Sequence, residues 1–162
     1  MTIEEKITSY ETLLHIRNVA KLLNGMAIEL MRRAEVHDQS KLEDPELSIF
    51  IEYTPKLATS TYGSDEYKQF LQEMKPALDH HYAHNQHHPE HFEEEADATF
   101  RGSSINCMTL IDILEMLCDW KSATLRHNDG DILKSIEINK KRFGLSDQLV
   151  AIMQNTVKAW EC

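Results

Sequence analysis

The sequence is poor in the residues that mark several classes of protein. Its three cysteines, Cys107, Cys118 and Cys162, are odd in number and show no CxxC spacing. This usage excludes a disulfide framework and a thiolate zinc site, and it predicts reduced thiols in a cytoplasmic protein. No run of about 18 apolar residues is present, so no transmembrane helix is expected. The first residues lack a basic segment followed by an apolar one, so secretion is not expected.

Basic residues are also scarce relative to acidic ones. The chain has 17 lysines and arginines against 27 aspartates and glutamates, which gives a formal net charge of −10. Such a surface repels a phosphate backbone, so neither long nucleic acid nor a membrane is expected as a partner. A small anionic substrate is compatible with this charge, because a metal and a few local cations can reverse the potential inside a pocket. A homo-oligomer is also compatible with the sequence.

Patterns typical of strands are scarce, whereas helix signals run along the chain. A length of 162 residues predicts one domain, residues 1–162, with an all-α fold. A capping pair, Thr2 and Glu5, begins an amphipathic stretch that runs to about Ala34. Further helices are predicted over residues 44–53, 64–88 with a restart at Pro76, 106–127, 131–142 and 146–160. Pro89 should end the helix predicted over residues 64–88, and residues 93–104 are predicted to form an acidic loop.

Histidine is the residue that is unusually concentrated. Six of the nine histidines lie between His80 and His91, in the segment HHYAHNQHHPEH. Imidazole is the commonest protein ligand for a transition metal, so this tract predicts a metal site. Helical spacing places His81, His84 and His88 on one face with Ala77.

Candidate ligands also lie outside the tract. One is the isolated pair His37-Asp38, and another is His15, which extends a helical apolar stripe and should face inward. Acidic side chains at 112, 115 and 119 point the same way on a predicted helix. Imidazoles and carboxylates suit manganese, iron, zinc, nickel or cobalt. A bound divalent cation activates water and neutralises a phosphate oxygen, which is the logic of metal-assisted phosphoester hydrolysis.

The order of these residues resembles the HD-domain metal-dependent phosphohydrolases. Members of that family have a helical-bundle core and an H…HD…D ligand set, matched here by His15, His37-Asp38 and Asp119. Lys41 follows Asp38 by three residues, as a lysine often does in that family. The resemblance implies a bundle of about six or seven helices. It also implies that His15, His37, Asp38 and Asp119 hold a first metal ion.

Three motifs are similar to an uncharacterised bacterial and phage branch of that family. They are an HDxSK motif at 37–41, an HNxHHPE-like tract at 84–90 and an EMxCDW-like helix at 115–120. Ser40 stands where the family more often has glycine. The resemblance implies that His81 and His88 hold a second metal ion and that Lys41 contacts a phosphate.

These observations predict a metal-dependent phosphohydrolase that acts on a nucleotide or another small phosphoester. The cofactor would be one or two ions of manganese, iron, nickel, cobalt or zinc. Asp38, Lys41 and Glu115 are the candidate catalytic residues: Asp38 would ligate the metal, and Glu115 or Asp112 would move a proton.

Three alternatives stay open. The chain can be a non-catalytic protein that binds a metal or nucleotide and sequesters it. It can be a di-iron oxygenase-type HD protein, although the Glu-x-x-His pairs usual in di-iron bundles do not occur in the sequence. It can also be a structural helical protein with incidental histidines.

Overall fold

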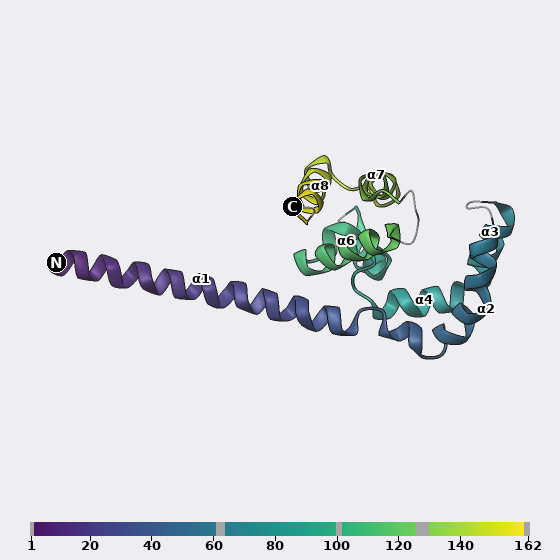
Figure 1. Cartoon of the computed structure of the whole chain (residues 1–162), viewed down its shortest axis with the longest axis horizontal. Helices are drawn as coiled ribbons and strands as arrows, with labels where there is room; N and C mark the ends of the chain where they lie inside the picture. Colours follow the sequence, from purple (N-terminus) through teal and green to yellow (C-terminus); the bar gives the residue numbers. More distant parts are fainter. Residues whose placement is uncertain (1, 61–63, 100–101, 126–129, 161–162) are drawn as a thin grey trace. The chain divides into compact units, whose positions relative to one another are not determined.

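The computed structural model describes residues 2–60, 64–99, 102–125 and 130–160. Within these ranges the chain is all-α and contains no strand, which confirms the predicted fold class (Figure 1). The α-helices are α1 (Ile3–Val36), α2 (Glu46–Thr59), α3 (Asp65–Glu73), α4 (Lys75–His84), α5 (Glu93–Thr99), α6 (Leu110–Thr124), α7 (Ile132–Phe143) and α8 (Asp147–Trp160). Short 3-10 turns are η1 (Gln39–Leu42), η2 (Pro89–Phe92) and η3 (Ser104–Cys107). None of the helices in the described ranges is long and apolar enough to cross a membrane.

The chain separates into two compact units, Met1–Val36 and His37–Cys162. The first consists of α1, which opens with the predicted capping box: Thr2 and Glu5 each accept a hydrogen bond from the other's backbone N–H. No residue of α1 is buried. A lone helix cannot bury its own apolar stripe. The inward position of His15 and the single-domain organisation therefore stay predictions.

The second unit has an apolar core built by α6, α7 and α8. Its buried members are Ile105, Met116, Leu117, Ile132, Ile136, Leu145, Val150, Met153 and Val157. The rings of Trp120 and Phe143 stack with centroids 6.3 Å apart and pack against this core. These contacts fix α6 and α7 side by side, and both helices contribute to the site described below.

Several predicted helix boundaries are confirmed. The Ser64 hydroxyl accepts a hydrogen bond from the Tyr67 backbone N–H at 3.1 Å, and so caps α3. Pro76 lies in the first turn of α4, where a missing N–H costs nothing. Asp131 caps α7, which ends at Gly144 in the left-handed conformation (φ 66°) that favours glycine. Ser146 caps α8 through Leu149.

The acidic loop predicted over residues 93–104 was wrong. Residues 93–99 form α5 and Ser104 begins η3, while residues 100–101 lie outside the described residues. Consecutive glutamates at 93–95 lie in the first turn of α5, where the helix dipole favours negative charge, and Ala96 is buried. The next helix begins at Leu110, not at about Asn106, because Thr109 and Asp112 form a capping box. Its predicted end at His127 lies outside the described residues.

Two other boundaries also differ from the prediction. Helix α2 continues past Tyr53 to Thr59 with Pro55 inside it, supported by a 2.7 Å ion pair between Lys56 and Glu52 one turn apart. Helix α4 ends at His84, before Pro89, because Asn85 is already extended. The second half of the histidine tract therefore lies beyond the helix, which changes which histidines can converge.

Candidate metal centre

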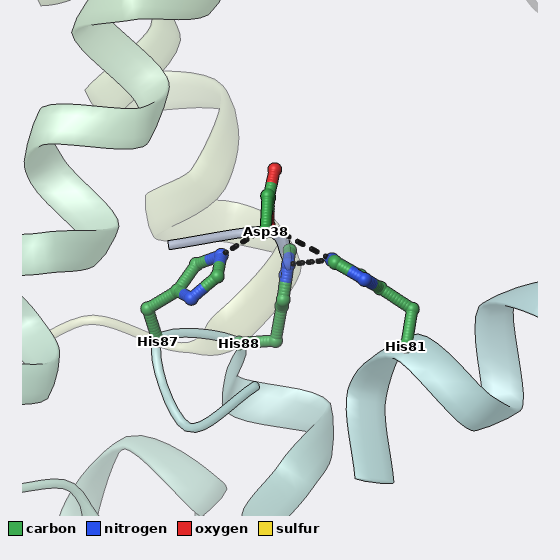
Figure 2. A group of neighbouring side chains, drawn as sticks. All are labelled: Asp38, His81, His87 and His88. Atoms are coloured by element: carbon green, nitrogen blue, oxygen red, sulfur yellow. Dashed lines mark hydrogen bonds and ion pairs between the residues drawn. The ribbon is translucent and has the colours of Figure 1, made fainter. Parts of the chain in front are cut away.

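Four segments of the second unit bring histidines and carboxylates together. His37 and Asp38 precede η1, and His81 lies on α4. His87 and His88 lie in the turn that follows α4, and α6 supplies carboxylates at 115 and 119. Figure 2 shows three imidazoles, those of His81, His87 and His88, arranged around the Asp38 carboxylate. Residues far apart in the sequence thus form one polar cluster.

Asp38 lies at the centre of this cluster. Its backbone is left-handed, with φ 57° and ψ 15°, a conformation that aspartate and asparagine tolerate better than most residues. Its Oδ1 lies 3.3 Å from Nε2 of His81 and 3.5 Å from Nε2 of His87. Its Oδ2 lies 3.6 Å from Nε2 of His37. Since the two oxygens face different imidazoles, this carboxylate can bridge two cations.

The first group of candidate ligands is Asp38, His81, His87 and His88. Ligands about 2.1 Å from one ion lie about 3.0 to 3.4 Å from one another, depending on the coordination angle. The two Asp38 contacts above and the 2.9 Å between Nε2 of His81 and Nε2 of His88 are close to that spacing. Asp38 Oδ1 and His87 Nε2 are buried and have no hydrogen-bond partner in the described part of the chain. A cation between them would satisfy both atoms.

The second group is His37, Asp38 and Asp119. Nε2 of His37 lies 3.6 Å from Asp38 Oδ2 and 3.8 Å from Asp119 Oδ1. The three side chains are partly exposed, between 21% and 28%. This group therefore lies at the edge of the cluster, where a cation would remain accessible to a ligand from solvent.

Glu115 orients two of the imidazoles from behind. Its Oε1 accepts a hydrogen bond from Nδ1 of His37 at 2.9 Å and lies 3.2 Å from Nδ1 of His87. An acceptor at Nδ1 fixes the tautomer that leaves Nε2 free, which is the usual arrangement behind a metal-bound histidine. The placement of Glu115 thus favours a role in positioning His37 and His87.

Glu46 orients the imidazole of His81 in the same way, by accepting a hydrogen bond from its Nδ1. Its side chain is fully buried, and its Oε2 accepts from Nδ1 of His81 at 2.9 Å. Its Oε1 accepts from Nδ1 of the half-exposed His80 at 2.7 Å. The lone pair on Nε2 of His81 is then directed toward Asp38. Because α2 packs on α4, this carboxylate reaches the back of the cluster from a distant part of the sequence.

Charge within the cluster shifts several pKa values. The neighbouring carboxylates of Asp119 and Glu115 raise the pKa of His37 to about 10. Burial works against ionisation of Asp38, but the adjacent His81 imidazole and Lys41 ammonium outweigh it and hold the pKa of this carboxyl below its usual range. Burial, reinforced by His87 and His81, lowers the pKa of His88 to about 3. The metal-free cluster therefore holds a protonated His37 and a neutral His88 at pH 7.

Metal binding is expected to release protons, because Nε2 of His37 ligates only after deprotonation. Below the His37 pKa of about 10, metal affinity should rise about tenfold per pH unit for each proton displaced. Calorimetric titration of Mn²⁺ in buffers of different ionisation enthalpy measures this release. A binding enthalpy independent of the buffer would contradict it.

The pairing of His37 with Asp119 and Glu115 also makes the stability of the metal-free protein depend on pH. The raised pKa of His37 gives stability that is fully present below pH 6.5, the pKa of an ordinary histidine, and is lost as the pH rises toward 10. The free energy of unfolding of the metal-free protein, measured between pH 6 and about pH 10, should therefore fall as the pH rises.

Replacing Glu46 by glutamine should weaken metal binding by about 10- to 100-fold, the usual effect of removing a partner behind a ligand. The amide keeps the shape but accepts through one oxygen only, so one of the two imidazoles faces an N–H₂ donor. Competition with a chelator measures the affinity, and ¹⁵N NMR reports the His81 tautomer. Glu52→Gln, on the exposed side of α2, is the matched control. Unchanged affinity and tautomer in Glu46→Gln would refute the positioning role.

The structure brings most of the predicted site residues together. His37, Asp38, His81, His88 and Asp119 all belong to the two groups. The Lys41 ammonium lies beside them, 2.6 Å from Asp38 Oδ2. The position of Glu115 behind two ligands is described above. His15 lies on α1, in the other unit, so its role as a ligand stays a prediction.

Two other residues of the sequence prediction lie away from the cluster. His84 is exposed and donates from Nδ1 to the His80 carbonyl at 2.7 Å, because the helix that should align it with His88 ends there. Asp112 accepts from both the backbone N–H and the hydroxyl of Thr109, and so serves as a helix cap.

Sequence reasoning missed His87 and Glu46. His87 did not fit the helical face that was used to choose among the histidines, although its position in the compact HHPE run was a signal. Glu46 carried no signal, since a glutamate after a proline is typical of a helix start.

A cleft of about 600 Å³ opens beside the cluster, lined mainly by α6 and α7. His88 and Asp119, one from each group of candidate ligands, form part of its wall. A small molecule in this cleft would touch both groups.

Comparison with curated proteins and with solved structures gave no match. A family model does match, over residues 4–159, which is nearly the whole chain. Its description is "Family of unknown function (DUF5662)". The chain therefore belongs to the DUF5662 family of unknown function.

Proposed function

We propose that this protein is a metal-dependent hydrolase of small phosphoesters, with a nucleotide or a similar compound as substrate. The observation that carries the proposal is the position of Asp38, whose two oxygens face two separate groups of metal-ligating atoms. Buried, unpartnered Asp38 Oδ1 and His87 Nε2 fit a cation between them. Mixed imidazole and carboxylate ligands suit manganese, iron, nickel, cobalt or zinc.

The candidate ligands would hold cations at two positions, one buried and one at the edge of the cluster. His81, His87 and His88 would hold a cation with Asp38 on the buried side, while His37 and Asp119 would hold one with Asp38 at the edge. A divalent cation bound there supplies an activated water and neutralises a phosphate oxygen. Lys41, whose side chain is 37% exposed, adds a positive charge beside Asp38 that a phosphate oxygen can approach.

The adjoining cleft supports turnover, because it gives a small molecule access to the more exposed group. Asp119 lines the cleft, so a substrate bound there would lie beside a cation held at the more exposed group. A protein that only sequesters a nucleotide would use the same residues. The two functions differ in the fate of the ligand, which sequestration leaves intact.

The test begins with protein purified without an affinity metal column. Elemental analysis before and after reconstitution with Mn²⁺, Ni²⁺ or Co²⁺ should find one or two equivalents. The reconstituted protein is then offered phosphomonoesters, nucleoside mono- and triphosphates and cyclic nucleotides, and released phosphate or ring opening is followed. Bound metal without hydrolysis, and ligand recovered intact after denaturation, would favour sequestration. Absence of metal after reconstitution would overturn both readings.

A further inference from the structure

The cleft beside the metal centre has a chemical character that narrows the substrate. It lies between α6 and α7 and reaches the candidate ligands His88 and Asp119 at one side. Its volume of about 600 Å³ is within the range of about 300 to 1,000 Å³ usual for small-molecule sites. A phosphate held at Asp119 would therefore leave the rest of its ester inside the cleft.

The wall of the cleft carries fewer cations than carboxylates. Its two cations are Lys134 and Arg142. Arg142 pairs with Glu90 at 2.7 Å, and Lys134 lies 3.8 Å from Asp131, and both carboxylates also line the cleft. A chain of phosphates needs cations in excess of the local carboxylates. The wall therefore suits an uncharged group, and it leaves a single phosphate to the metal centre.

Two uncharged polar side chains lie on the α7 side of the cleft. Ser135 and Asn139 are one turn apart and both face the cleft, and Thr124 faces it from α6. Hydroxyl and amide groups both donate and accept, so they can pair with sugar hydroxyls or with the edge of a base. A fatty acyl chain would offer these hydroxyl and amide groups no hydrogen bond.

Aromatic rings complete the wall. Trp120 lines the cleft and is held in place by its stack on Phe143, with an interplanar angle of 9°. Tyr82 lines the cleft next to His88, with ring centroids 5.0 Å apart. Rigid aromatic rings beside polar groups favour a ligand that is itself a flat ring with polar edges.

We propose that this cleft binds the nucleoside part of a nucleoside monophosphate, with its single phosphate at the metal centre. The proposal rests on the proposed function for the fate of the phosphate. The recognition of the nucleoside depends on the cleft alone, so the two can be tested separately.

The experiment compares two alanine-to-tryptophan variants. Ala123 lines the cleft and is exposed, so a tryptophan there fills the cleft without disturbing the core. Ala151 is also exposed, on α8 and outside the cleft, and gives the matched control. The probes are the common nucleosides and their mono- and triphosphates, and methyl phosphate serves as a substrate too small to need the cleft.

Binding of unphosphorylated nucleosides is measured first, by ligand-observed NMR on the manganese-free protein and by calorimetry. At least one nucleoside should bind to the parent protein, and Ala123→Trp should weaken it at least tenfold while Ala151→Trp leaves it unchanged. In hydrolysis, Ala123→Trp should raise KM for the nucleoside monophosphate, and Ala151→Trp should leave hydrolysis of this substrate and of methyl phosphate unchanged.

The outcomes separate the two claims. Nucleoside binding that depends on Ala123, without any hydrolysis, keeps this proposal and removes the hydrolase function. Hydrolysis of methyl phosphate with no nucleoside binding, or with triphosphates preferred over monophosphates, removes this proposal and keeps the hydrolase. Equal binding to Ala123→Trp and the parent protein would also overturn it.

Discussion

Replacing Asp38 by asparagine is expected to remove bound metal and to lower phosphoester hydrolysis by about a thousandfold, because the metal contributes several kcal/mol to the transition state. Both Asp38 oxygens face ligand nitrogens, at 3.3, 3.5 and 3.6 Å, so one substitution affects both groups of ligands. An amide is neutral and offers only one oxygen. Elemental analysis and a phosphate-release assay measure the two effects.

Asparagine is the appropriate replacement because of the backbone. The φ of 57° at Asp38 is strained for most residues, and asparagine tolerates it nearly as well as aspartate. Loss of metal in this variant is then attributable to the lost charge and not to a reshaped turn. Asp65→Asn, at a fully exposed position in the first turn of α3, is the matched control. Full metal content and activity in Asp38→Asn would remove the proposed function.

Replacing His87 by glutamine is expected to weaken metal binding by at least about 100-fold, above the effect of removing a group behind a ligand. His87 is 1% exposed, and its Nε2 has no hydrogen-bond partner among the described residues. That nitrogen faces Asp38 Oδ1, so losing it opens the buried group of ligands. A chelator competition assay with Mn²⁺ or Co²⁺ measures the affinity.

The neighbouring His84 gives an internal control from the same tract. It is exposed and bonded to the His80 carbonyl, so His84→Gln should bind metal as the parent protein does. Equal losses in the two variants would mean that the tract binds metal as a flexible polyhistidine segment. Equal retention would mean that His87 is a structural core histidine.

Helix signals that are local in the sequence predicted much of the fold. Ser64, Asp131 and Ser146 cap helices at the predicted starts, and Gly144 ends α7 close to the predicted end at residue 142. Capping depends on side chains within a few residues, so sequence alone is enough to find it. The prediction failed over residues 93–104, where burial of Ala96 and the helix dipole together override an acidic composition.

Part of the candidate site could also be predicted from the sequence. His37, Asp38, His81, His88 and Asp119 were chosen from spacing and resemblance, and the structure places all five in one cluster. His84 was predicted to share a helical face with His88, and this was wrong because the helix ends at His84, before Asn85. His87 enters the cluster from the turn that follows.

By itself the sequence determined the all-α class, the density of imidazoles and the presence of a central His37-Asp38 pair, because composition and local periodicity carry that information. Only the tertiary structure decided which atoms meet. The left-handed turn at Asp38 directs its two oxygens to different imidazoles, and Glu46 reaches His81 because α2 packs against α4. Such contacts join residues dozens of positions apart, and no local pattern in the sequence encodes the distance between them.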